Sequence, residues 1–138
     1  MVPFTSAPNT LFCSTAPRTL DGRAVARLPA TCGELVQGSL DGVRCLVSCP
    51  ISFGSEVEVK LSATPGWCVP PDTPKTVRAI MQGLSALGRS EMGGQLRVTS
   101  HIPRGRGYGS STADIGAALY ALGEALGTPL EPVTVARL

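Results

Sequence analysis

The residues best suited to chemistry lie in one short segment, residues 102–114, which reads I-P-R-G-R-G-Y-G-S-S-T-A-D. Its three alternating glycines, Gly105, Gly107 and Gly109, can take positive φ angles and let a ligand approach the backbone. They lead into a predicted helix that begins near Ser110, and the first N–H groups of a helix lack intrahelical partners. Those N–H groups and the helix dipole attract anions. The segment is therefore predicted to bind phosphate.

Side chains of the same segment support this prediction. Arg104 and Arg106 are cations that can pair with phosphate oxygens. Ser110, Ser111 and Thr112 carry hydroxyl groups, which are hard oxygen donors for phosphate or Mg²⁺. The segment is not a P-loop, which needs a lysine before its hydroxyl residue, and the glycine spacing does not match G-x-G-x-x-G. An alternative is a strand-to-helix turn with a serine N-cap and no ligand.

Residues 103–113 resemble the ATP-binding motif P-x-x-x-G-L-G-S-S-A-A of the GHMP kinases, a family that includes galactokinase, homoserine kinase and mevalonate kinase. Tyr108 stands where that motif has Leu or Met, and Thr112 where it has a small residue. The segments L-P-A-T-C-G-E-L-V-Q-G at 28–38 and L-V-S-C-P at 46–50 extend the match. Together with S-S-T-A-D-I, they are similar to the L-threonine kinase branch of propanediol utilisation and cobalamin synthesis.

This resemblance implies a kinase that uses ATP and Mg²⁺ to phosphorylate a hydroxyl group of a small molecule, with L-threonine or a related metabolite as the expected acceptor. It implies Ser111 as the metal-binding serine, and it places the catalytic base beyond Leu138. The residues that it assigns to ATP binding are Pro103, Arg104, Gly105, Arg106, Gly107, Tyr108, Gly109, Ser110, Ser111, Thr112 and Ala113.

The upstream motif supplies candidates for the acceptor site. Glu34 is the carboxylate nearest to a recognisable motif, and Gln37 can hydrogen-bond a polar substrate such as an amino acid. The sugar kinases of the family have G-E-H-x-D in this region, and Leu35 of this chain departs from it, so sugar specificity is not carried over. The alternative for Glu34 is an exposed turn residue.

Three further residues have a structural as well as a chemical interpretation. Cys32 is predicted to be a small buried residue rather than a nucleophile, since no basic neighbour would lower the pKa of its thiol. His101 precedes the glycine segment and could contact phosphate, but a structural role at a strand end is preferred. Asp114 could act as a catalytic base, although a favourable interaction with the helix dipole in the first turn explains it more simply.

Composition limits the classes of function. The 12 basic and 10 acidic residues form no run, so electrostatic binding of nucleic acid is not indicated. The five cysteines include no C-x-x-C pair, which favours reduced thiols over disulfides or a zinc site. No apolar stretch is long enough to span a membrane, and the N-terminus has no signal-peptide pattern. We therefore expect a soluble cytoplasmic protein without a membrane partner.

The apolar pattern predicts an α+β domain. Residues 1–23 are expected to be a flexible extension, and residues 24–138 the ATP-binding domain. Strands are predicted at 24–32, 44–50, 55–61 and 95–100, with Gly38 and Asp41-Gly42 forming the turn between the first two. The strand at 55–61 alternates, with its apolar residues on one face and its charged residues on the other.

A helix capped by Thr73 is predicted from Pro74 to Gly88, with one apolar stripe formed by Val77, Ile80, Met81, Leu84 and Leu87. A second helix is predicted from near Ser110 to Gly127, with Ile115, Leu119, Leu122 and Leu126 on one side. The order β-β-β-α-β-loop-α is similar to the N-terminal domain of the GHMP kinases, which resembles ribosomal protein S5 domain 2.

A length of 138 residues fits one domain, whereas the kinases of this family have two. The chain is therefore expected to be a kinase fragment, inactive alone, or one that needs a C-terminal kinase domain in cis or in trans. A non-catalytic nucleotide-binding or interaction module that keeps the fold is the alternative. RNA binding, suggested only by the S5-like fold, is disfavoured by the balanced charge.

Overall fold

The computed structural model describes residues 22–138. The predicted flexible extension, residues 1–23, lies outside the described residues apart from its last two, and Arg23 already begins the first strand. The elements are β1 (Arg23–Leu40), β2 (Val43–Ser62), β3 (Trp67–Cys68), α1 (Pro74–Ala86), β4 (Gly93–Ser100), α2 (Ser110–Ala125) and α3 (Pro132–Arg137).

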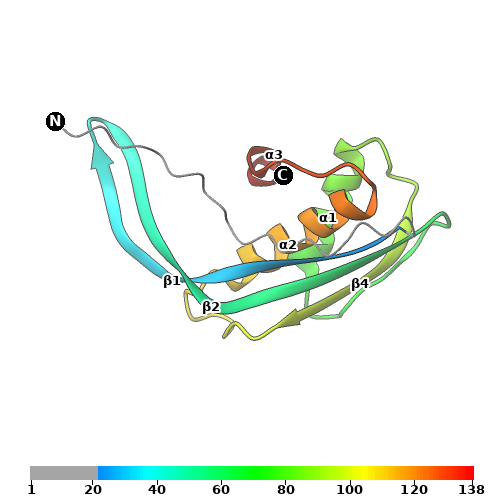
Figure 1. The fold of residues 1–138 in the computed structure, drawn as a ribbon, viewed down its shortest axis with the longest axis horizontal. Coiled ribbons are helices and arrows are strands. Elements are labelled where there is room, and N and C mark those ends of the chain that lie inside the picture. Colours follow the sequence, from blue (N-terminus) through cyan, green and yellow to red (C-terminus); the bar gives the residue numbers. More distant parts are fainter. Residues whose placement is uncertain (1–21) are drawn as a thin grey trace.

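The strands form one sheet in the order β1-β2-β4-β3, and helices α1 and α2 lie together on one of its faces (Figure 1). Neighbours pair antiparallel, except for the short β3, which runs parallel to β4. The predicted α+β class is confirmed. Two predicted strands, 44–50 and 55–61, are in fact one strand, because Pro50 lies at a register shift opposite Thr31, where a missing N–H is tolerated. β3 was not predicted.

The turn between β1 and β2 lies at the predicted Asp41-Gly42, but Gly38, also expected in the turn, pairs with Cys45 because β1 continues past its predicted end to Leu40. Asp41 and Gly42 have φ angles of 52° and 80°, and the two residues join the paired ends Leu40 and Val43. Positive φ at both central positions is the reason that Asp-Gly is favoured in two-residue hairpins.

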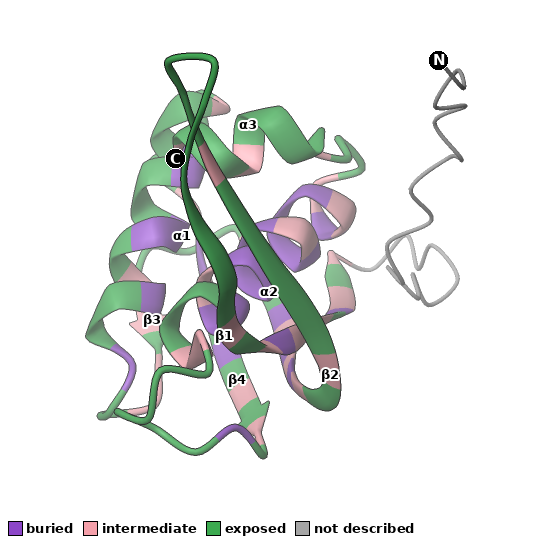
Figure 2. Cartoon of the chain, turned by 90° about the vertical axis from the view of Figure 1, so that its left-hand side faces the viewer, coloured by how far each residue is buried: buried purple, intermediate pink, exposed green. Residues whose placement is uncertain are grey.

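Residues 31–53 of this hairpin, here called the ribbon, extend away from the helices (Figures 1 and 2). Nearly all ribbon residues are exposed or only half-buried. Large patches of exposed apolar surface indicate an interaction site more often than a free surface. The exposed large apolar side chains of the ribbon are Leu35, Val36, Leu40, Val43, Leu46, Val47 and Phe53.

β2 alternates between the two faces of the sheet as predicted. Val57 and Val59 are fully buried beneath the helices, and Leu61 is partly buried. Glu56 and Glu58 point to the opposite face, where their carboxylates pair with arginines of β1. This alternation fixes the register, since a shift of one residue would bury the carboxylates.

Helix α2 differs from its predicted pattern. It was expected to bury one stripe that included Ile115, but it is buried on almost every side, chiefly through alanine and glycine. A Cβ atom at Gly116 would lie 2.4 Å from Leu28 Cδ1, and one at Gly83 of α1 would lie 2.9 Å from Leu119. Small residues therefore let α2 approach the sheet and α1 closely.

Helix α1 begins and ends near the predicted residues. Pro74 is in its first turn, and Gly88 follows it with a φ of 65°. The predicted cap residue, Thr73, makes no side-chain cap, because its hydroxyl donates to the carbonyl of Pro70 at 3.0 Å. Met81, predicted in the apolar stripe, is 39% exposed. No described helix has the length and apolar character needed to cross a bilayer.

The position of α2 depends on Leu122, which is fully buried. Leu122→Ala removes packed methyl groups and leaves a cavity, so we expect the free energy of unfolding to fall by about 2–5 kcal/mol. Leu40→Ala is the matched control, since Leu40 is 69% exposed at the ribbon tip, and its effect should stay within about 0.5 kcal/mol. Urea titration followed by circular dichroism measures both. Equal losses would contradict the assigned core.

Candidate active site

The glycine-rich segment between β4 and α2, here called the phosphate loop (residues 103–109), is held at both ends. Ile102 before it and Ala113 after it are both buried in a small cluster with Ala30 of β1. The N–H of Thr31 donates to the carbonyl of Tyr108 at 3.1 Å. The two sequence motifs therefore meet, because the upstream motif supplies the strand against which the loop rests.

The three glycines of the loop adopt the predicted backbone. Gly105, Gly107 and Gly109 have φ angles of 68°, 79° and 68°. A Cβ atom at Gly105 or Gly107 would meet nothing within 4 Å, so the angle, and not crowding, demands glycine there. The space beside the backbone is open.

Gly109 is also the N-cap of α2, and no side chain caps the helix. The alternative of a serine N-cap is therefore wrong. The N–H of Ala113 donates to the carbonyl of Gly109 at 2.9 Å, and the N–H groups of the three residues before it precede the first intrahelical bond. The N-terminus of α2 can therefore donate to an anion.

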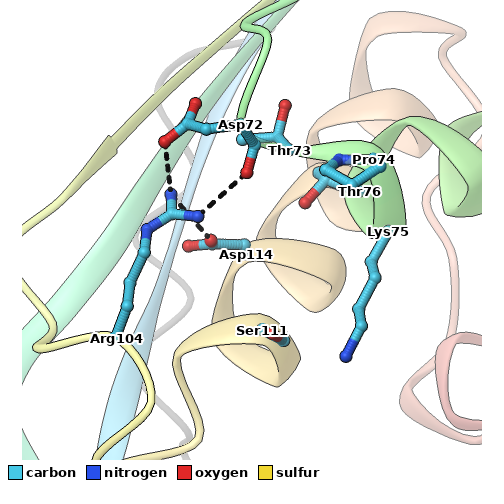
Figure 3. A pocket seen from close by; sticks show the side chains of 8 residues that line it. All are labelled: Asp72, Thr73, Pro74, Lys75, Thr76, Arg104, Ser111 and Asp114. Carbon is cyan, nitrogen blue, oxygen red and sulfur yellow. Dashed lines mark hydrogen bonds and ion pairs between the residues drawn. The ribbon is translucent and has the colours of Figure 1, made fainter.

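A pocket of about 170 Å³ opens between the N-terminal ends of α1 and α2 (Figure 3). Both helix dipoles point their positive ends toward it, which favours an anion. Its charged side chains are two cations and two carboxylates, so their formal charges cancel. The lining residues are Asp72, Thr73, Pro74, Lys75, Thr76, Arg104, Ser111 and Asp114.

Arg104 links the phosphate loop to both helices. One of its terminal nitrogens donates to the main-chain oxygen of Asp72 at 3.1 Å. The other lies 3.5 Å from the Asp72 carboxylate and 3.7 Å from that of Asp114. In Figure 3, Lys75 lies on the other side of the pocket, with Ser111 between the two cations. Phosphate oxygens in the pocket would thus lie within reach of both.

Asp114 has surroundings that the sequence did not predict. It is the fifth residue of α2, so it lies beyond the first turn, and it makes no contact typical of a helix cap. Its side chain is only 5% exposed. One carboxylate oxygen, Oδ2, is the one near Arg104, while Oδ1 is buried without any hydrogen-bond partner. The interpretation of Asp114 as a dipole partner in the first turn is therefore wrong.

The pocket includes only some of the residues that the sequence nominated. Of the loop residues, Arg104 and Ser111 line it. Glu34 and Gln37 do not, since both are exposed on the ribbon, and Glu34 pairs with Ser48 in a strand instead of lying in a turn. Whether they bind an acceptor stays a prediction.

Two other expectations concern residues outside the pocket. Cys32 is exposed on β1 and not buried, because the ribbon leaves the helix layer at this point. His101 is exposed directly after β4, and its backbone N–H lies 3.4 Å from the carbonyl of Gly54. It does not line the pocket, which agrees with a place at a strand end.

Sequence reasoning missed the wall of the pocket that α1 provides, residues 72–76. These residues form no recognisable motif, and only the packing of α1 beside α2 brings them to the phosphate loop. The one available signal was Pro74 at a helix start, which marks an N-terminus but not what it faces.

Comparisons with known proteins agree with this geometry. Residues 75–138 match the family model described as GHMP kinases N terminal domain. The chain is 39% identical over 115 residues to an L-threonine kinase of Citrobacter freundii and 37% identical over 118 residues to one of Salmonella typhimurium. These alignments cover 83% and 86% of the chain.

A homoserine kinase structure from Cytophaga hutchinsonii has a similar fold, with a TM-score of 0.61 and 25% identity over 85% of this chain. The chain covers 39% of that structure. It spans 40% and 39% of the length of the two L-threonine kinases.

Proposed function

We propose that the chain is the ATP-binding part of a kinase that phosphorylates a hydroxyl group of L-threonine or a related metabolite, since residues 75–138 match the GHMP kinases N terminal domain and two L-threonine kinases are similar to the chain. The observation that supports the proposal best is the pocket between two helix N-termini, bordered by the phosphate loop and by Arg104 and Lys75. Its dipoles and cations suit a nucleotide phosphate chain.

In this proposal the phosphate loop and α2 bind the phosphates. The free N–H groups at the start of α2 donate to phosphate oxygens. Arg104 exchanges its ion pairs with Asp72 and Asp114 for phosphate, which is feasible because these pairs measure 3.5 and 3.7 Å and the arginine side chain is half exposed. Lys75 binds from the side of α1. Phosphoryl transfer depends mainly on such positioning and charge neutralisation.

A Mg²⁺ ion bound with the nucleotide would supply positive charge to offset the negative charge that develops during transfer. Ser111 is the proposed serine ligand. Its hydroxyl lines the pocket, and no side chain of α2 is used as an N-cap.

L-threonine is the proposed acceptor because two L-threonine kinases share 39% and 37% of the aligned residues. Glu34 and Gln37 remain the candidates for its binding. Thr31 touches the loop, and the strand rises about 3.3 Å per residue, so Glu34 lies roughly 10 Å along the ribbon from that contact. An acceptor bound at Glu34 would therefore lie next to the phosphate-binding pocket and outside it.

The proposal also explains why the ribbon has exposed apolar side chains. We expect them to be covered by polypeptide that corresponds to the remaining length of the relatives. The same polypeptide would supply the catalytic base, which the resemblance to the GHMP kinases places beyond Leu138. Without that cover the ribbon should promote aggregation.

The loop backbone should be necessary for nucleotide binding. Gly107→Val forces a branched side chain onto a φ of 79° and should weaken ATP binding at least about tenfold, as judged by isothermal titration. Gly42→Val is the matched control, because Gly42 has a φ of 80° and open space at the ribbon tip. Equal affinity of the Gly107 variant and the wild type would remove the loop from the site.

Loss of the Ser111 hydroxyl should affect catalysis more than acceptor binding. In an enzyme that contains the rest of the kinase, Ser111→Ala should raise the barrier by on the order of 2–4 kcal/mol, with little change in the KM for the acceptor. Ser85→Ala, an exposed serine of α1, serves as the control. An unchanged kcat in steady-state kinetics would rule out the proposed role.

The acceptor and the need for more polypeptide can be tested in one assay. With ATP and Mg²⁺, the 138-residue chain alone should yield no O-phospho-L-threonine by mass spectrometry, and activity should appear when the rest of the kinase is added in cis or in trans. L-homoserine, offered in parallel, tests the acceptor class of the structural relative. Turnover by the chain alone would contradict the proposal, and nucleotide binding without transfer by any form would favour a non-catalytic module.

A further inference from the structure

We propose that Asp114 is a cation-binding residue of the pocket, with Oδ1 of its carboxylate directed at the divalent cation that accompanies the nucleotide. The inference rests on the proposed function and adds a residue to it. It assigns a carboxylate of this chain to the metal. Ser111 would be its neutral partner.

The first observation is the state of the carboxylate itself. Oδ1 is buried and has no hydrogen-bond partner, and the side chain as a whole is 5% exposed. A buried polar atom without a partner is costly, and a charged one more so. Arg104 offsets this cost only in part, because it lies 3.7 Å from the other oxygen, Oδ2. The pocket therefore contains an unsatisfied acceptor that a cation would satisfy.

The second observation is the charge balance. Lys75 and Arg104 only cancel Asp72 and Asp114, so the lining side chains give no net positive charge to receive a triphosphate. Asp72 is 68% exposed and screened by water, whereas Asp114 faces the pocket from a buried position. Repulsion between Asp114 and a bound phosphate is removed when a divalent cation lies between them.

The third observation is the set of donors. Ser111 and Asp114 are three residues apart on α2, so their side chains lie on the same side of the helix, and both line the pocket. Mg²⁺ is usually bound by one or two carboxylates together with substrate phosphates and water. Among the residues that the structure describes, no group of three His, Cys, Asp or Glu side chains could hold a metal alone. The cation is therefore expected to bind with the nucleotide and not before it.

A competing role for Asp114 is to hold Arg104 in place. Asp72 contacts the same guanidinium through its carboxylate and its main-chain oxygen. If positioning were the whole role of Asp114, removal of Arg104 would cause the same change in metal dependence as removal of the Asp114 charge. If Asp114 binds the cation, the two changes differ.

The test is isothermal titration of the 138-residue chain with ATP in excess EDTA and with ATP in excess Mg²⁺. Wild type should bind the magnesium complex more tightly. Asp114→Asn should reduce that enhancement by on the order of tenfold or more, and it should bind metal-free ATP more tightly than wild type, because one negative charge is gone. These opposite changes are not expected from damage to the fold.

Two variants serve as matched controls. Asp72→Asn removes the same charge from the exposed rim of the pocket, and Arg104→Gln removes the arginine without touching either carboxylate. Both should keep the enhancement by Mg²⁺, although Arg104→Gln should weaken both nucleotide forms. Thermal melting of each variant establishes that it is folded.

If Asp114→Asn does not fold, the wild type supplies the answer. Substoichiometric Mn²⁺ added with ATP should broaden the amide NMR signals of Ser111 and Asp114 before those of Gly42. The proposal is overturned if Asp114→Asn keeps the full enhancement by Mg²⁺, if Arg104→Gln loses it equally, or if Mn²⁺ leaves Ser111 and Asp114 unaffected. A wild-type chain that binds neither form of ATP would overturn the proposed function, and this inference with it.

Discussion

The candidate site depends on the burial of the residues on either side of the phosphate loop. Ile102 and Ala113 insert into one cluster with Ala30, so the loop cannot lift away from the sheet without exposing apolar surface. The loop itself makes few contacts and contains three residues with positive φ. A backbone of that kind has a defined shape only when its ends are fixed. The hydrogen bond from Thr31 to Tyr108 also fixes the loop directly before the N-cap of α2.

The accuracy of the sequence predictions follows from how local each determinant is. The positive φ angles of the loop, the Asp41-Gly42 turn and the limits of α1 are set by a few neighbouring residues, and these were predicted correctly. The alternation of Val57 and Val59 with charged residues likewise gave the strand and its buried face. Features that depend on contacts between residues far apart in the sequence were harder to predict from local patterns.

Three such features were missed or wrong. Pro50 ended a predicted strand, although the continuous β2 tolerates it because the pairing with β1 is irregular there. The stripe assigned to α2 was too narrow, since a helix rich in alanine and glycine can be covered on several sides. The pocket wall from α1 and the burial of Asp114 arise from the packing of two helices, which no local pattern encodes. The family resemblance supplied the loop residues but not this wall.

The close packing of α2 also limits how the site can respond to a ligand. At its buried glycines and alanines, α2 meets its neighbours through backbone and methyl groups that have no rotamers to change, and Leu119 and Leu122 pack closely against Gly83 of α1. Sliding or tilting the helix would therefore produce direct steric overlap with Leu28 or with α1. The wall formed by α1 and Arg104 is the compliant side, because the ion pairs of Arg104 with Asp72 and Asp114 measure 3.5 and 3.7 Å and the arginine side chain is half exposed. When a ligand binds, α2 should thus stay in place, and the residues at the start of α1 and Arg104 should move.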